Sequence, residues 1–102
     1  GGNSSEQVGA NKSVDASSNI SENAGKNFAM TAGDNMTGTA GKDVTIKAGK
    51  KMLLDAGEEI TIQTGSARIQ MKKNGDIVIE GKKISVNASG DIVMKGKKIL
   101  QN

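Results

Sequence analysis

An eight-residue repeat runs through the first two thirds of the chain. From Val8 the sequence divides into VGANKSVD, ASSNISEN, AGKNFAMT, AGDNMTGT, AGKDVTIK, AGKKMLLD and AGEEITIQ. The first place is Ala in six of these seven octads, and the second place is Gly in all but one. A repeat of this length constrains the fold strongly, because every unit has to form the same small structural element.

The residues of each octad alternate between apolar and polar. Val44 and Ile46 are apolar, whereas Thr45 and Lys47 are polar. This period of two predicts a short, half-buried strand, and the recurring glycines weaken a helix. Each Gly with the polar residues after it predicts a corner of about three residues, in which we expect backbone angles that favour glycine. Equal strands and equal corners indicate an all-β solenoid.

After Thr64 the repeat loses its strict phase, but apolar pairs continue. They are Ile69/Met71, Ile77/Ile79, Ile84/Val86 and Ile92/Met94, followed by Ile99. Two interpretations of the Lys73–Asp76 segment remain open, because Asn74-Gly75 is also a strong hairpin signal. The segment is either one more corner or a three-residue hairpin loop, which would place Met71 opposite Ile77 and Ile69 opposite Ile79.

The composition does not support an ordinary globular core. Only 34% of the residues are hydrophobic and the single aromatic residue is Phe28. Disorder is disfavoured, because proline is absent and the apolar residues are strictly spaced. A single-chain solenoid with three strands per turn would be a stub about 20 Å tall, which is thin for independent stability.

Three intertwined chains could form together the hydrophobic core that one chain lacks. We expect an all-β, intertwined homotrimeric triple-stranded β-helix, or β-prism, of octad repeats, with about twelve strand layers and a height of roughly 60 Å. Each strand would hydrogen-bond to strands of the other chains, and the apolar columns would meet on the axis. The predicted trimer core consists of Val44, Ile46, Met52, Leu54, Ile60, Ile62, Ile69, Met71, Ile77, Ile79, Ile84, Val86, Ile92 and Met94.

The ordered series of octads resembles a known family. Repeats such as AGKDVTIKAG and AGEEITIQTG, followed by KKNGDIVIEGKKI, are similar to the C-terminal needle of VgrG, the spike protein of bacterial type VI secretion systems, related to phage tail spikes. The resemblance implies a homotrimeric spike that sheath contraction drives through a target membrane. It also implies a PAAR-repeat protein or an effector at the tip. The implied location is the bacterial cytoplasm during assembly and the exterior or the target cell after firing.

The expected tip is the C-terminal layer, where Ile99, Leu100, Gln101 and Asn102 would contact a cap protein. We expect residues 1–7 to be a tag remnant or a disordered lead-in, and residues 8–102 to form the needle domain. Within it, residues 8–67 are regular octads and residues 68–102 are phase-shifted repeats. The start without Met suggests a piece of a longer protein.

The residue types needed for most enzyme chemistry are missing. The chain has no Cys and no His, which removes thiolate sites and the commonest general base. Glu58-Glu59 falls at a corner and is expected to be solvated, and no phosphate-binding loop or calcium-binding nonapeptide is present. We therefore expect no catalytic site, no metal site, no cofactor and no enzyme activity. The net charge of +3 without aromatic clusters does not favour nucleic-acid binding.

Two charged residues occupy columns that should face the axis. Lys12 and Glu22 stand where neighbouring octads carry apolar residues. Three like charges at one level of a dry core would cost several kcal/mol per ion, so this end is either frayed and wet or contains an axial cavity near Glu22. A monomeric β-solenoid that binds ice or carbohydrate remains the alternative function, although its outward positions lack the aligned Thr rows of ice binders.

Overall fold

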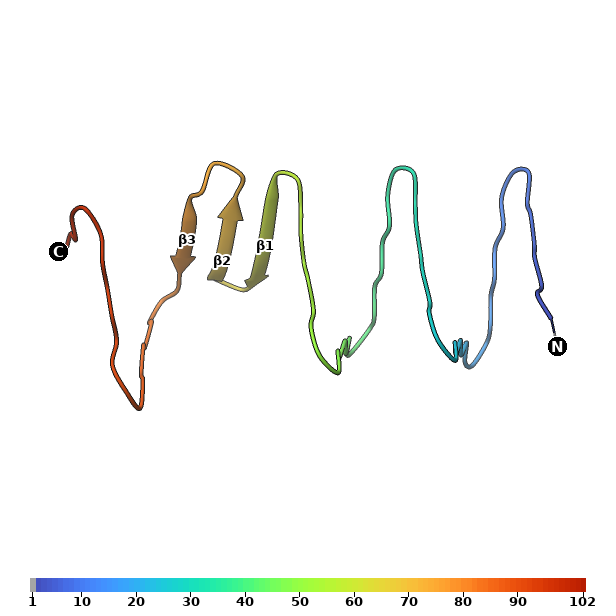
Figure 1. Cartoon of the computed structure of the whole chain (residues 1–102), viewed down its shortest axis with the longest axis horizontal. Coiled ribbons are helices and arrows are strands. Elements are labelled where there is room, and N and C mark those ends of the chain that lie inside the picture. Colours follow the sequence, from blue (N-terminus) through green and yellow to red (C-terminus); the bar gives the residue numbers. More distant parts are fainter. Residues whose placement is uncertain (1) are drawn as a thin grey trace. The chain divides into compact units, whose positions relative to one another are not determined.

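The computed structural model describes residues 2–102, and its strands form one antiparallel sheet (Figure 1). The strands are β1 (Glu59–Thr64), β2 (Ala67–Lys72) and β3 (Ile77–Glu80), and their order in the sheet is β1-β2-β3. No helix occurs among the described residues. The all-β expectation is confirmed at this level.

Gly65 and Ser66 connect β1 to β2 in a two-residue turn. Thr64 and Ala67 close the ladder on either side of the turn. Gly65 has a φ of 55°, whereas Ser66 does not have a positive φ. This combination fits a type II′ turn, which takes glycine at its first central position because that position needs a positive φ. This turn was not predicted from the sequence, in which the segment is the point where the octads lose their phase.

The β2–β3 connection decides between the two interpretations of the Asn74-Gly75 segment in favour of the hairpin. Met71 pairs with Ile77 and Ile69 pairs with Ile79, which is the register predicted for a three-residue loop. The Gly75 amide donates to the Lys72 carbonyl at 3.0 Å, and Gly75 has a φ of 100°. This geometry is that of a β-turn followed by a glycine bulge. The Asn74 side-chain oxygen accepts the Asp76 amide at 3.0 Å and stabilises the loop.

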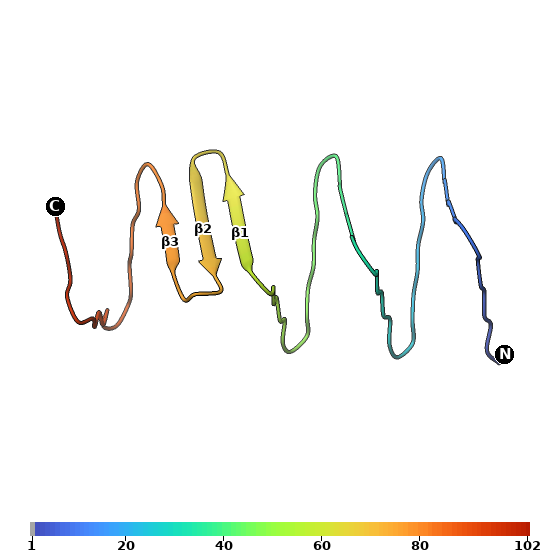
Figure 2. The ribbon, with the colours of Figure 1, turned by 90° about the horizontal axis from the view of Figure 1, so that it is seen from above.

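The central strand β2 has a partner from its own chain on both edges (Figure 2). The expectation that every strand pairs with strands of other chains is therefore wrong for β2. The physical reason is the length of the two loops, because short hairpin turns return the chain beside itself before it can cross to another face. Only the outer edges of β1 and β3 remain open to further strand pairing.

Outside the sheet the backbone bends at the predicted corners. Bends lie at 9–10, 17–18, 25–26, 33–34, 41–42, 49–50 and 57–58, so they repeat every eight residues. The backbone angles at these corners differ from the expectation, because only Gly65 and Gly75 have a positive φ among the described residues. The octad corners therefore use angles that other residues also adopt, which explains why Ser17 can replace glycine at one of them.

The chain divides into two units, Gly1–Val44 and Thr45–Asn102. The described part of the first unit contains no strand, and in it Lys12 forms an ion pair with Glu6 at 2.8 Å. Both Lys12 and Glu22 are exposed. The expected lead-in at residues 1–7 falls partly outside the described residues, because Gly1 is not described. The sheet belongs to the second unit, in which β2 spans the boundary predicted after residue 67.

None of the described residues is buried, so residues 2–102 of one chain form no hydrophobic core. Four residues of the sheet are half-buried, namely Ile60, Arg68, Gln70 and Val78. Every other described residue is exposed. The fold of the single chain is therefore held by local turns and two strand ladders, and its apolar side chains remain in contact with solvent.

Candidate functional site

The candidate functional site is the apolar face of the β1–β3 sheet. Antiparallel pairing aligns its side chains into two rows across the three strands, since paired residues project from the same side of a sheet. One row is Ile60, Met71 and Ile77, and the other is Ile62, Ile69 and Ile79. All six residues belong to the predicted trimer core. The structure therefore brings together, on one surface, residues that are up to nineteen positions apart.

This apolar face is uncovered by the described part of the chain. The exposed fraction is 40% for Met71 and 43% for Ile69, both on the central strand, and it rises to 64% for Ile77 on β3. Side chains of a central strand are partly shielded by those of the two flanking strands. Burying such a face against another apolar surface would contribute about 25 cal/mol per Å² removed from water.

The opposite face of the sheet is mainly polar. Alternation along the strands places Thr61, Gln63, Arg68, Gln70 and Glu80 on it, with Val78 as the apolar exception. Arg68 pairs with Glu80 in the β2–β3 register, and the Arg68 Nη2 to Glu80 Oε1 distance is 2.8 Å. This ion pair was not predicted from the sequence, although a hairpin with Ile69 opposite Ile79 also places Arg68 opposite Glu80. The Arg68 Nε atom has no hydrogen-bond partner among residues 2–102.

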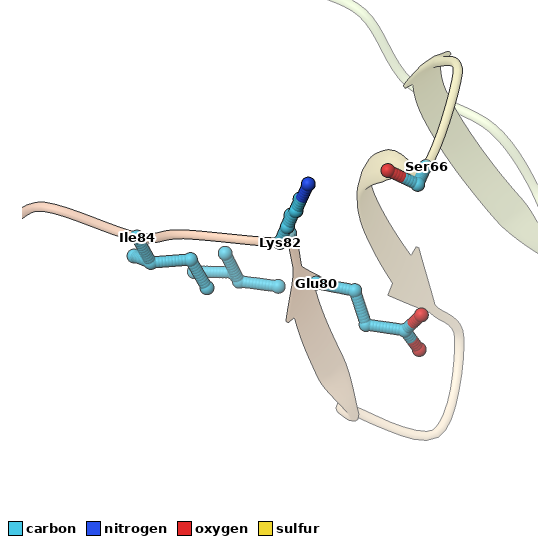
Figure 3. Close-up of a pocket in the computed structure, with 6 residues that line it drawn as sticks. Ser66, Glu80, Lys82 and Ile84 are labelled. Carbon is cyan, nitrogen blue, oxygen red and sulfur yellow. The ribbon is translucent and has the colours of Figure 1, made fainter.

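Two further core candidates lie beside the apolar face. Leu54, which precedes β1, lines a hollow of about 210 Å³ together with Ile60 and Met71. Ile84, which follows β3, lines a hollow of about 590 Å³ together with Ile79 (Figure 3). A Cβ added to Gly81 would lie 3.4 Å from Ile84 Cγ1, an ordinary van der Waals distance, so Ile84 lies close to the end of β3. The apolar surface therefore extends past both ends of the sheet.

The structure does not bring the remaining core candidates to this face. They are between 51% and 73% exposed: Val44, Ile46, Met52, Val86, Ile92 and Met94. Val44 belongs to the first unit, whereas the others belong to the second. Their predicted role in a trimer axis stays a prediction.

The hollows at the two ends of the sheet bring together no recognisable set of reacting groups among residues 2–102. In the hollow at the end of β3, the Glu80 and Lys82 side chains point in different directions (Figure 3). At the other end of the sheet, Glu58 and Glu59 are exposed as predicted, and Thr61 Oγ1 donates to Glu59 Oε2 at 3.1 Å. Among residues 2–102 there is no group of three or more His, Cys, Asp or Glu side chains placed to hold a metal ion.

The predicted tip residues are exposed at the C-terminal end. Ile99 is 59% and Leu100 is 79% exposed, and Gln101 and Asn102 are also exposed. Two adjacent apolar side chains in this state are available for contact with another protein. Contact of these residues with a cap protein stays a prediction.

Residues 2–102 contain no helix of the length and apolarity that crossing a membrane requires. In the comparisons with known proteins, no protein-family model, no curated protein and no solved structure matches the chain.

Proposed function

We propose that the chain is a structural needle that assembles as a homotrimer and punctures a target membrane as part of a contractile secretion machine. The observation that carries this proposal is the amount of exposed surface. One chain exposes 11,222 Å², whereas a folded monomer of this mass exposes about 5,400 Å². A chain with regular turns, two strand ladders and about twice the usual exposed surface is suited to burying that surface against other chains.

The size of the excess favours an obligate assembly. About 5,800 Å² per chain would have to be covered to reach the usual value for a monomer. A standard protein–protein contact covers only about 800 Å² per partner, and obligate interfaces cover about 1,000 to 2,500 Å² or more per partner. Three chains that wind about one axis would supply contact of this extent, because each chain would touch both others along its whole length.

The chemistry of the sheet agrees with a wall of such a needle. Its apolar face offers Ile and Met side chains to an axis, and its other face offers Thr61, Gln63 and Gln70 to water. In a trimer three such apolar faces would close a narrow dry interior, which explains how a chain with 34% hydrophobic residues can have a core. A polar outer face with charges of both signs would move through a membrane opening without strong adhesion.

The proposed role is mechanical, with no catalytic step. Hydrogen-bonded ladders and the winding of three chains would carry the load of sheath contraction. The target membrane would be contacted mechanically, and a PAAR-repeat protein or an effector would sit on the end that contains Ile99 and Leu100. The needle would assemble on the secretion apparatus in the bacterial cytoplasm and would then be driven out of the cell.

A monomeric solenoid that binds ice or carbohydrate is not favoured by any specific observation. Such a solenoid would pair strands of successive turns within one chain and bury a core between its walls. In residues 2–102, strand pairing is confined to β1–β2 and β2–β3, and no side chain is buried.

The test compares two neighbouring residues of β2 that lie on opposite faces. Each variant is placed in the spike protein of a bacterium that assembles a contractile secretion system, and killing of a competitor strain is counted. Ile69→Lys would put three ammonium groups on the axis and is expected to abolish killing. Gln70→Lys lies on the outer face and is expected to preserve killing. Equal killing by both variants would contradict the proposal.

A further inference from the structure

Asn74 and Gly75 form the exposed tip of the β2–β3 loop. No other asparagine of the chain is followed by glycine. The side-chain amide of asparagine is an electrophile, and the backbone nitrogen of the next residue attacks its Cγ most readily when that residue has no side chain to block the approach. A Cβ added to Gly75 would meet nothing within 4 Å, so the space on that side of its Cα is open. The pair therefore contains both partners of an intramolecular reaction.

Hydrogen bonds hold the Asn74 side chain over its own backbone. Its Oδ1 accepts the Asp76 amide at 3.0 Å, and its Nδ2 donates to Asp76 Oδ2 at 3.3 Å. The Asp76 N–H is thus placed on the oxygen that gains negative charge when a nucleophile adds to Cγ, and such a donor stabilises the transition state of the addition. The Gly75 N–H donates to the Lys72 carbonyl at 3.0 Å, and this bond has to open before the nitrogen attacks. Because it lies in an exposed loop, its opening does not require the strand ladders to separate.

We propose that Asn74 is a site of spontaneous deamidation and that the reaction weakens the β2–β3 hairpin. The Gly75 nitrogen forms a bond to Asn74 Cγ, the bond between Cγ and Nδ2 breaks, and the side-chain nitrogen leaves as ammonia with the proton of the Gly75 amide. The product is a cyclic succinimide. Water then opens the ring, adding its hydroxyl to one of the two carbonyl carbons and its proton to the Gly75 nitrogen. This inference does not depend on the proposed needle.

The two directions of ring opening give different loops. Opening at Cγ leaves an aspartate at position 74, whose carboxylate lies beside the Asp76 carboxylate in place of an amide donor, and like charges repel. Opening at the backbone carbonyl leaves an isoaspartate, in which the main chain runs through Cβ and Cγ, so the loop gains one backbone atom. The second product disturbs the hairpin more, because the pairing of Met71 with Ile77 depends on the length of the loop.

The chain supplies a matched control in Asn87. Asn87 is exposed and lies in the same unit, but it is followed by Ala88, whose Cβ hinders the attack. Cleavage after lysine places Asn74 and Asn87 in separate peptides, residues 74–82 and 84–95. The full chain is kept at mildly alkaline pH, which favours loss of the amide proton, and mass spectrometry follows the replacement of NH₂ by OH in both peptides. Conversion is expected to be at least tenfold faster at Asn74, and equal rates would overturn the inference.

A variant assigns the isoaspartate to this position. Asn74→Gln keeps a side-chain amide, but its cyclisation requires a larger ring and is expected to be blocked. Labelling by an isoaspartate methyltransferase should therefore fall at least tenfold in the aged variant relative to the aged unmodified chain. No aspartate of the chain is followed by glycine, so the background from aspartate isomerisation should be low. Equal labelling of the two aged chains would overturn the assignment to Asn74.

Hydrogen exchange tests the effect on the hairpin. In the unmodified chain, the amides of β3 are expected to exchange at least tenfold faster after ageing than before, whereas the β1–β2 ladder should change little, because its Gly65-Ser66 turn contains no asparagine. Asn74→Gln should exchange at the same rate before and after ageing. Unchanged exchange of β3 in molecules whose Asn74 has become isoaspartate would overturn the proposed effect on the hairpin.

Discussion

Arg68 and Glu80 face each other across β2 and β3, and their side chains form an ion pair with a 2.8 Å contact between Nη2 and Oε1. The side chains are 32% and 56% exposed, respectively. The pair lies on the polar face of the sheet, opposite the apolar rows. In the proposed needle this side of the sheet would face water.

The pair is half-exposed, because water still reaches both side chains, and this predicts a small contribution to stability. Exposed ion pairs contribute about 0–1 kcal/mol, and salt screens them further. A double-mutant cycle with Arg68→Ala and Glu80→Ala, measured by denaturant unfolding at one protein concentration, is expected to give a coupling free energy below about 1 kcal/mol that disappears in 1 M salt. A coupling several times larger and insensitive to salt would mean that this face is buried in the assembly.

Glycines with a positive φ and glycines of the octad corners are predicted to differ in how much stability they lose when alanine replaces them. Gly75→Ala has to place a side chain at a φ of 100°, which costs about 1–2 kcal/mol per chain. Gly49→Ala is the matched control, because its φ is not positive and an added Cβ would meet nothing within 4 Å. Thermal unfolding should show a lower midpoint for Gly75→Ala and little change for Gly49→Ala. Equal destabilisation would show that the octad corners are crowded in the assembly.

Local features of the fold could be predicted from the sequence because they depend on neighbouring residues. The octad glycines predicted the corners, and Asn74-Gly75 indicated a hairpin that pairs Ile69 with Ile79 as one of two interpretations, the one that the structure shows. The Gly65-Ser66 turn was within reach of the same reasoning, because Gly-Ser between two alternating segments is also a hairpin signal. It was not predicted, because the segment was interpreted as the point where the octads lose their phase.

The pairing partners of the strands could not be predicted in the same way. Alternation of apolar and polar residues specifies which face of a strand is buried, but it is identical for a partner in the same chain and a partner in another chain. The residues of β2 therefore alternate between apolar and polar as expected, although both edges of β2 pair with strands of the same chain. The number of chains depends on contacts between copies, which no local pattern encodes.

A carboxylate introduced on the apolar face of β1 is predicted to prevent assembly, whereas one introduced on the polar face is predicted to be tolerated. Ile62→Asp would place a charge in the apolar row beside Ile69, and leaving three such charges in a dry interior costs several kcal/mol per ion. Gln63→Asp would place the charge opposite Arg68, where it is compensated and hydrated. Light scattering should show loss of assembly for Ile62→Asp alone. Assembly by both variants would show that the apolar face is not an interface.

Removal of the C-terminal residues is predicted to weaken binding of a cap protein without affecting assembly of the chain. Removing residues 99–102 deletes two exposed apolar side chains, Ile99 and Leu100, but leaves the β1–β3 sheet intact. Binding of a PAAR-repeat partner, measured by co-purification, is expected to fall at least tenfold while the mass of the assembly per chain stays the same. The control Lys95→Ala should bind normally. Unchanged binding after the truncation would place the cap elsewhere.

The mass of the protein in solution tests the central claim most directly. Sedimentation equilibrium of the unmodified chain, over a hundredfold range of concentration, is expected to give one species of three times the 10.5 kDa chain mass. Circular dichroism of that species should show β-structure. A single species at 10.5 kDa with the same spectrum would contradict the account, because a folded monomer would have to bury its apolar residues without other copies.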